Sequence, residues 1–491
     1  MRYLAHMTEL TFFWHDYETF GRVPRRDRPA QFAGVRTDAE LNEIDAPVMH
    51  YCQPAPDFLP DPEACLLTGI LPQTCLQLGV PEHAFAAAIE QQLARPGTVG
   101  VGYNSIRFDD EVTRHLFWRN LIDPYAREWQ NECGRWDLLD VVRATWALRP
   151  AGIQWPLHED GRPSFKLEDL TRANGLAHEA AHDALSDVRA TIAMARLIRA
   201  RQPKLWDFCL KLRKKDAVAQ EMAQAQAKGQ PFLHISGMYG VERGCLAVVW
   251  PLAPHPTHKN EVIVWDLGED PSELFTLGIE AIRTRMFSRS EDLPEGTTRL
   301  PVKTIHLNKS PIVIGNLKTL GDDVAAKWGI DMAQAQRHAA TAATRAHEVA
   351  VMWPAVFERP AREGATDVDE DLYGGFIGND DRRTLARLRT LAPSQLAAKR
   401  PAFADARLDE LFFRFRARNW PDSLNEAEAA QWQEHCAHRL HDGAGGGVTL
   451  EAFFEQIDVL GEALESRSDE RGQDILGALV DYATQIAPAR A

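Results

Sequence analysis

Residues 11–21 read TFFWHDYETFG, an aromatic run that carries two acids one residue apart. Apolar residues alternate close to period two here, which predicts a buried β-strand from Thr11 to Glu18. Because side chains two residues apart leave the same face of a strand, Asp16 and Glu18 are placed to share one cation. Taken alone, an acid pair of this kind is more often a solvated strand end, so its meaning depends on what accompanies it.

The first 200 residues mix strand and helix patterns. Strands over residues 31–37 and 48–53, joined by a polar turn at 38–43, predict an antiparallel hairpin. A further strand is expected at residues 98–103, and helical periodicity predicts helices at 82–93, 109–121, 137–148, 166–173 and 184–200. This alternation is typical of an α/β domain with a mixed sheet.

The rest of the chain changes character twice. Short strands punctuated by Gly and Pro, at residues 234–236, 246–250, 262–266 and 302–308, predict a small β-barrel. From about residue 322 the pattern becomes helical, the acidic segment 358–381 is expected to be a loop or linker, and the Gly-rich residues 442–447 are expected to connect helices. We therefore predict three domains, at residues 1–202, 203–355 and 356–491.

The composition is that of a globular protein and excludes a disordered or collagen-like chain, with 491 residues, 45% hydrophobic and 25% charged. The formal net charge of −15 means that any site for a polyanion is a local patch. Seven scattered cysteines without a C-x-x-C pair indicate neither a disulfide framework nor a zinc ribbon and favour the cytoplasm. No apolar stretch approaches the roughly 20 residues of a membrane span, so no membrane partner is expected.

Two further acidic patterns accompany the first strand. Asp109 follows Asn104 at a predicted strand-to-helix junction. His182 and Asp187 lie at the predicted start of a long helix. Each has a simple alternative: acids in a first helical turn complement the helix dipole, and Asp183 is suited to cap the helix. Taken together, four acids and a histidine at these spacings indicate a site for metal-dependent chemistry.

Longer strings around these residues resemble a known family. They are residues 15–21 (HDYETFG), 27–33 (DRPAQFA), 102–104 (GYN), 107–114 (RFDDEVTR), 135–140 (RWDLLD), 181–184 (AHDA), 234–240 (HISGMYG), 306–309 (HLNK) and 415–419 (FRARN). The sequence resembles the DEDDh exonuclease superfamily and, within it, the bacterial exodeoxyribonuclease I family, over nearly the whole chain. This resemblance implies an RNase H-like exonuclease domain, an SH3-like β-barrel and a helical C-terminal domain.

The resemblance also implies the chemistry. Asp16, Glu18 and Asp187 would ligate two Mg²⁺ ions, with Mn²⁺ as a substitute, and Asp109 would hold the second ion directly or through water. His182 would take the proton from the attacking water. Glu18 and Lys166 would contact the substrate, which is single-stranded DNA degraded from its 3′ end to 5′ mononucleotides in DNA repair and recombination.

Three basic segments are candidates for a DNA track. Residues 196–228 hold nine Lys and Arg against three acids, residues 299–318 hold four against none, and residues 382–418 hold ten against three. Solvated helix faces are the alternative. Tyr125 and Trp129, spaced i, i+4, are either stacking platforms or core residues. The predicted DNA contacts are Arg114, Tyr125, Trp129, Arg143, Lys215, Lys303 and Lys309.

The family also binds the acidic C-terminal tail of single-strand DNA-binding protein. Arg149 matches one basic position of that pocket, whereas near residues 315–321 the match weakens, so the other pocket residues stay unassigned. A single wrapped chain needs no symmetric partner, so a monomer is expected by resemblance.

Three other functions remain open from the sequence. His178-Glu-Ala-Ala-His182 spells the H-E-x-x-H helix of zinc proteases, although Asn174-Gly175 reads as a helix stop just upstream and no third ligand follows. RNA as the substrate would require contacts to the 2′-hydroxyl that a sequence does not display. A catalytically inactive DNA-binding protein is disfavoured because all five acidic and histidine positions are intact.

Overall fold

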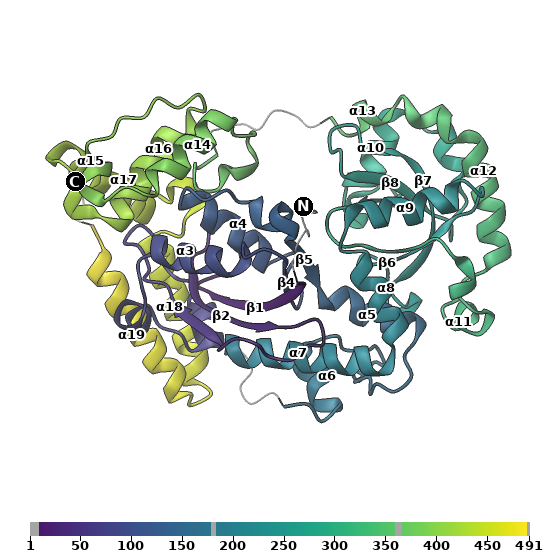
Figure 1. Ribbon diagram of the computed structural model, residues 1–491, viewed down its shortest axis with the longest axis horizontal. Coiled ribbons are helices and arrows are strands. Elements are labelled where there is room, and N and C mark those ends of the chain that lie inside the picture. The colour runs from purple at the N-terminus through teal and green to yellow at the C-terminus, as the bar shows by residue number, and fades with distance from the viewer. Residues whose placement is uncertain (1–8, 178–182, 359–365, 489–491) are drawn as a thin grey trace, which may run out of the picture. The chain divides into compact units, whose positions relative to one another are not determined.

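The computed structural model describes residues 9–177, 183–358 and 366–488 (Figure 1). The chain divides into two compact units, the first comprising residues 1–134, 178–189 and 364–491 and the second residues 135–177 and 190–363. In the part of the chain that is described, no helix is both long and apolar enough to cross a membrane.

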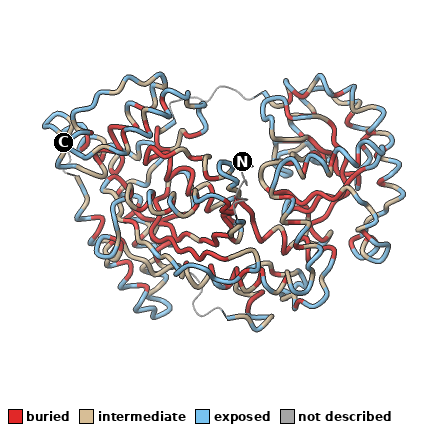
Figure 2. The backbone as a smooth tube through the Cα atoms, in the orientation of Figure 1, coloured by how far each residue is buried: buried red, intermediate tan, exposed pale blue. Residues whose placement is uncertain are grey.

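A five-stranded mixed sheet lies at the centre of the first unit. Its order is β3-β2-β1-β4-β5, with bounds Thr11–Thr19 (β1), Pro29–Thr37 (β2), Val48–Tyr51 (β3), Thr98–Gly102 (β4) and Gly134–Asp137 (β5). The central strand β1 pairs antiparallel with β2 and parallel with β4, which confirms the predicted mixed sheet. Helices cover both of its faces, so β1 is buried along most of its length (Figure 2).

Helices of the first unit pack on this sheet and on one another. They are α1 (Pro62–Thr68), α2 (Pro72–Leu78), α3 (Glu82–Leu93), α4 (Asp109–Arg119), the start of α7 (Ala184–Arg201), α14 (Asn379–Leu388), α15 (Pro393–Ala397), α16 (Arg407–Asn419), α17 (Glu426–Asp442), α18 (Leu450–Glu465) and α19 (Glu470–Ile486). Phe13 and Phe32 of the sheet share one buried cluster with Phe85 of α3 and Leu116 of α4. The apolar side chains of β1 therefore anchor the strand that carries Asp16 and Glu18.

The second unit contains a five-stranded antiparallel sheet. Its order is β10-β6-β7-β8-β9, with bounds Phe232–Ile235 (β6), Leu246–Pro254 (β7), Glu261–Asp266 (β8), Val302–His306 (β9) and Ile312–Ile314 (β10). Its helices are α5 (Leu138–Leu148), α6 (Leu167–Ala173), the rest of α7, α8 (Pro203–Lys211), α9 (Lys215–Gln226), α10 (Ile279–Phe287), α11 (Asp322–Lys327), α12 (Met332–Ala350) and α13 (Trp353–Val356).

Differences from the sequence prediction fall on short elements. The helices α1, α2 and α10 and the strands β5 and β10 are not predicted, because segments of three to nine residues carry too little periodicity. Residues 126–128 and 130–132 form two 3₁₀ turns, and Trp129 between them has a non-helical φ of −152°, so Tyr125 and Trp129 do not lie on one α-helix.

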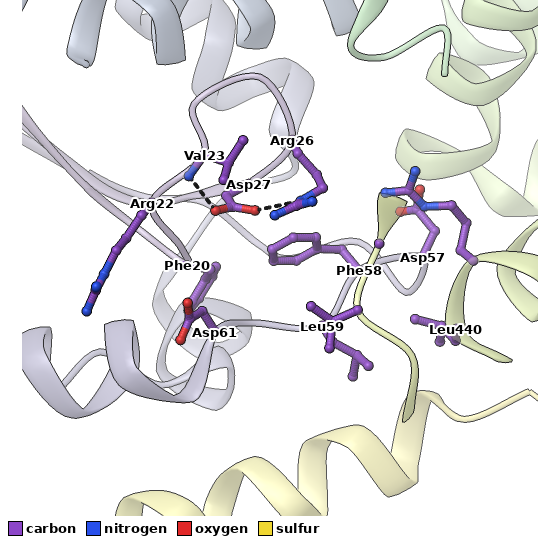
Figure 3. A pocket seen from close by; sticks show the side chains of 13 residues that line it. Phe20, Arg22, Val23, Arg26, Asp27, Asp57, Phe58, Leu59, Asp61 and Leu440 are labelled. Carbon is purple, nitrogen blue, oxygen red and sulfur yellow. Dashed lines mark hydrogen bonds and ion pairs between the residues drawn. The ribbon is translucent and has the colours of Figure 1, made fainter. Parts of the chain in front are cut away.

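Two residues, Gly21 and Asp27, shape the loop after β1. The Asp27 carboxylate accepts a hydrogen bond from the backbone N–H of Val23 at 2.7 Å and contacts the Arg26 guanidinium (Figure 3). A Cβ at Gly21 would lie 2.1 Å from Asp27 Oδ2, so only glycine leaves room for this closure. Gly21 and Asp27 thus shape the turn that leads from the acidic strand into β2.

Candidate metal centre

Three carboxylates from two elements meet at the end of β1. Asp16 and Glu18 leave the same face of β1, opposite Ala33 and Gln31 of β2. Asp187 lies in the first turn of α7, and one carboxylate oxygen from each of Asp16, Glu18 and Asp187 lies within 4.8 Å of the others. The structure therefore brings together the three residues that the sequence predicts as direct ligands.

Asp109 reaches the same site from the start of α4. The chain turns sharply between β4 and α4, where Asn104 has a left-handed φ of 65°. Asp109 is buried, and its Oδ1 accepts a hydrogen bond of 3.1 Å from the backbone N–H of Tyr17. This bond fixes the helix terminus to the residue between Asp16 and Glu18, so Asp109 adds its charge to the group without joining the three closest ligands.

The electrostatics of these carboxylates fit a divalent cation. Burial raises the pKa of Glu18 to about 8, and the nearby charges of Asp187, Asp109 and Asp183 add to the rise. The pKa of Asp16 is also well above its usual value, first through burial and then through Asp109 and Glu18. Buried carboxylates that resist ionisation together are stabilised by a hard cation, because Mg²⁺ and related ions prefer oxygen ligands.

Asp183 is the acidic residue whose role the sequence underestimates. Its Oδ2 accepts a hydrogen bond of 3.2 Å from the backbone N–H of Ser186, which agrees with the predicted cap of this helix. Its charge also raises the pKa of both Asp16 and Glu18. A capping residue one turn from a ligand therefore contributes to the field of the site, which a spacing pattern does not reveal.

For two further predicted site residues, His182 and Lys166, the structure gives no distance to the carboxylates. His182, like His178 and Glu179 of the H-E-x-x-H string, lies outside the described residues. Lys166 belongs to the second unit, where it precedes α6 with an exposed side chain 3.8 Å from the carboxylate of Glu168. Its substrate contact stays a prediction.

The Arg114 side chain has protein partners. Its guanidinium contacts both carboxylate oxygens of Glu128, at 2.7 and 2.9 Å, and donates to Glu111 at 2.8 Å. It also lies over the ring of Tyr125, whereas Trp129 is 66% exposed and so is not a core residue. The exposed Trp129 ring suits the predicted stacking role, while the charge of Arg114 is largely balanced by its neighbours.

The remaining predicted DNA contacts all lie in the second unit. Arg143 forms an ion pair of 2.6 Å with Asp140, and Lys215 begins α9 with an exposed side chain. Lys303 lies on β9, where burial lowers its pKa, and Lys309 lies in the turn after β9. Their contacts with DNA stay predictions.

A cavity of about 570 Å³ surrounds Arg149 in the second unit. Its lining combines three basic side chains (Arg149, Lys204 and Lys228) and one acid (Glu221) with apolar side chains that include Leu148, Phe208 and Ile314. Arg149 donates to the carbonyl oxygen of Thr319 at 3.3 Å, which places the segment around residues 315–319 at the cavity wall. The sequence does not identify Lys204, Phe208 and Lys228 as neighbours of Arg149, because they come from α8 and from the turn after α9, which are distant from Arg149 along the chain.

Family models match three successive parts of the chain. They are described as exonuclease (residues 13–195), exonuclease I SH3-like domain (213–359) and exonuclease I C-terminal domain (366–486). The first match contains residues 178–182, so the H-E-x-x-H string lies within an exonuclease domain. The predicted fold class, an RNase H-like domain followed by an SH3-like barrel and a helical domain, is confirmed.

Relatives match along the full length of the chain. The exodeoxyribonuclease I of Escherichia coli is 45% identical over 97% of this chain and 98% of its own length, and that of Haemophilus influenzae is 42% identical over 91% and 94%. A solved structure of exonuclease I from Methylocaldum szegediense has a TM-score of 0.91 at 46% identity and covers 97% of this chain and 99% of its own.

Two further solved structures contain bound molecules. The zinc-bound complex of E. coli exonuclease I with single-stranded DNA has a TM-score of 0.90 at 41% identity, covering 97% of this chain and 99% of its own. A structure of SSB and exonuclease I with the inhibitor CFAM has a TM-score of 0.88 at 40% identity, covering 98% and 100%.

Proposed function

This chain belongs to the exonuclease I family, and from that premise we propose that it removes 5′ mononucleotides stepwise from the 3′ end of single-stranded DNA, in DNA repair and recombination. The family predicted from the motif strings is thereby confirmed, and the protein is a nuclease. The observation that carries the proposal is the group formed by Asp16, Glu18 and Asp187.

The carboxylates would hold two Mg²⁺ ions, for which Mn²⁺ would substitute. Two such cations, when bound, stabilise negative charge on the attacking and leaving oxygens of a phosphodiester. Asp16, Glu18 and Asp187 supply oxygen ligands, and Asp109 supports the second ion from the start of α4. His182 takes a proton from the attacking water, and Lys166 contributes a cation to the substrate phosphate.

Hydrolysis of a 5′-labelled DNA oligonucleotide tests this function. We expect a ladder that shortens from the 3′ end in the presence of Mg²⁺ and disappears with EDTA. Matched duplex DNA, RNA and a 3′-blocked strand serve as controls. Preferential cleavage of RNA would instead indicate an exoribonuclease, and binding without cleavage would indicate a DNA-binding protein without catalysis.

We propose that the cavity at Arg149 binds the acidic C-terminal tail of single-strand DNA-binding protein. Arg149, Lys204 and Lys228 line the cavity with apolar side chains that include Phe208 and Ile314. These three cations outnumber the one acid of the lining, Glu221, so the cavity suits a peptide with both carboxylates and an apolar end. The structure that contains SSB and exonuclease I supports the same partner.

Replacing Arg149 tests this partner. Arg149→Ala is expected to weaken binding of a fluorescent acidic tail peptide about 10-fold, because one charge pair at the cavity is lost. Hydrolysis of free single-stranded DNA should change little. Arg172→Ala is a matched control, since Arg172 is an exposed arginine of the same unit outside the cavity. Equal peptide affinities for the two variants would contradict the assignment.

The remaining expectations rest on the family and are part of the proposal. We propose domain limits near residues 202 and 355, a monomer, and the cytoplasm as the compartment. All seven cysteines are free thiols, which supports a reducing compartment.

A further inference from the structure

Phe376 is a large apolar side chain in an unusual position. It is 95% exposed and follows two glycines, Gly374 and Gly375, in the segment between residue 366 and helix α14. If this loop were held by few contacts, the exposure of Phe376 would not indicate a binding role. The contacts of the preceding residues decide whether this exposure is built into the fold.

The backbone before Phe376 is held by side chains from other elements. Trp118 of α4 donates to the carbonyl oxygen of Val368 at 2.7 Å, and the Tyr373 hydroxyl bonds to the Glu111 carboxylate. Arg407 of α16 donates to the carbonyl oxygen of Gly375 at 3.1 Å. These contacts fix the backbone at three points before Phe376. They hold its side chain in solvent, near the end of α4.

A cavity of about 220 Å³ lies beside Phe376. It is lined mainly by apolar side chains from the end of α4 and the loop that follows it, from residues 372–377, and from α14, among them Trp118, Leu121, Leu372, Ile377 and Leu385, with the rings of Tyr125 and Phe376. This volume is below the roughly 300 Å³ of the smallest common ligand sites, so it suits a single flat ring system.

The charges at the rim of this cavity are unequal. Arg389 is paired with Glu90, with one contact at 3.2 Å. Arg382 is 43% exposed, and its nearest carboxylate, on Asp123, is 3.9 Å away. The apolar lining and the exposed Phe376 ring suit the base of one nucleotide, and the loosely paired Arg382 guanidinium suits its phosphate.

We propose that this cavity binds one base of the single-stranded substrate, stacked on Phe376, with a neighbouring phosphate at Arg382. The proposal rests on the proposed function and adds a subsite to it. Helix α4 carries Asp109 at its first residue and leads to the cavity at its last turn. Ten residues at about 1.5 Å each span about 15 Å, which is about four nucleotides at a stacked spacing of 3.4 Å.

Binding of oligonucleotides in EDTA, which prevents cleavage, tests the subsite. Phe376→Ala is expected to weaken binding of a 12-nucleotide strand about 10-fold, because a stacking contact is lost, and to leave a dinucleotide unaffected. Phe376→Trp should restore the affinity. Val459→Ala is the matched control, since Val459 is 69% exposed on α18 and outside this cavity.

Photo-crosslinking identifies the contact directly. A single 5-iodouracil is moved along the 12-nucleotide strand, and we expect a crosslink to the peptide containing Phe376 when it lies about four nucleotides from the 3′ end. Equal affinities of Phe376→Ala and Val459→Ala, with no such crosslink, would overturn the subsite while leaving hydrolysis by the wild type intact. Failure of the proposed function has a different signature, because the wild type would then not hydrolyse the strand at all.

Discussion

Asp187→Ala should lower the rate of DNA hydrolysis by at least about 1,000-fold and leave DNA binding nearly unchanged. One carboxylate oxygen of Asp187 lies within 4.8 Å of one from Asp16 and one from Glu18, so the loss of Asp187 removes one of three oxygen ligands. Metal ions supply several kcal/mol of charge stabilisation in the transition state, and each 1.36 kcal/mol is a factor of about ten in rate. Initial rates at saturating DNA and affinities in EDTA measure the two effects separately.

Asp183→Asn is the matched control for this variant. Asparagine caps a helix as well as aspartate does, so the hydrogen bond to Ser186 is kept while one charge is removed. We expect it to retain activity within about 10-fold, because Asp183 acts on the site through its field alone. If the two variants lost equal activity, α7 would contribute negative charge to the metal centre and not a metal ligand. Near-normal hydrolysis by Asp187→Ala would show that the assignment of the metal centre is wrong.

The residues of the metal centre could be predicted because their spacing along the chain reflects secondary structure. Residues two apart on a strand face the same way, so Asp16 and Glu18 were predictable as a pair. The relation of this pair to Asp109 and Asp187 came only from the family resemblance, since it depends on how β4 and α7 pack against β1. Spacing thus predicted the acid pair, and the family resemblance assigned the full ligand set. The tertiary contacts then bring one carboxylate oxygen each of Asp16, Glu18 and Asp187 within 4.8 Å of the others.

The residues that bind partners were harder to predict, because their meaning depends on distant neighbours. Arg114 reads as a free cation in the sequence, yet Glu128 lies fourteen residues away and contacts its guanidinium. Phe376 falls in a stretch that the sequence indicates only as an acidic linker. Its position follows from Trp118 and Arg407, which are far from it along the chain. Long-range partners of this kind leave no periodic signal.

Arg418→Ala should destabilise the first unit by about 3–5 kcal/mol, the second large effect expected for this chain. Arg418 is 2% exposed, and its guanidinium contacts Asp57 at 2.7 Å and also contacts Asp369. Arg28 and Arg414, 3.1 and 3.5 Å from Asp369, are further buried cations of this group. Loss of Arg418 would leave two buried carboxylates with too little compensating charge, which is why the expected loss of stability exceeds that of an ordinary ion pair.

The pH dependence of this loss has a definite sign. Burial by itself would raise the pKa of Asp57 and Asp369, but the charge and hydrogen bonds of Arg418, together with the charge of Arg28 and other neighbouring donors and cations, outweigh it and hold both pKa values well below the usual range. Carboxylates with a lowered pKa stabilise the fold above their unfolded pKa of about 4, and that stability is lost as the pH falls through the folded pKa. Without Arg418 both pKa values rise, so much of this contribution is absent even at neutral pH, and the stability that the variant loses relative to the wild type should be largest above about pH 4 and shrink as the pH falls.

Thermal unfolding of matched variants separates this buried group from ordinary surface charge. At about 2–4 °C per kcal/mol, the midpoint of Arg418→Ala should fall by about 10 °C. Arg22→Ala breaks a 2.9 Å ion pair with Glu63 whose members are 70% and 47% exposed, and it should shift the midpoint little, because solvent screens exposed pairs. A midpoint for Arg418→Ala equal to that of Arg22→Ala would mean that the buried pairs contribute no net stability. A larger fall near neutral pH that shrinks toward low pH would instead identify Arg418 as the charge that joins α16 to the loop containing Asp57.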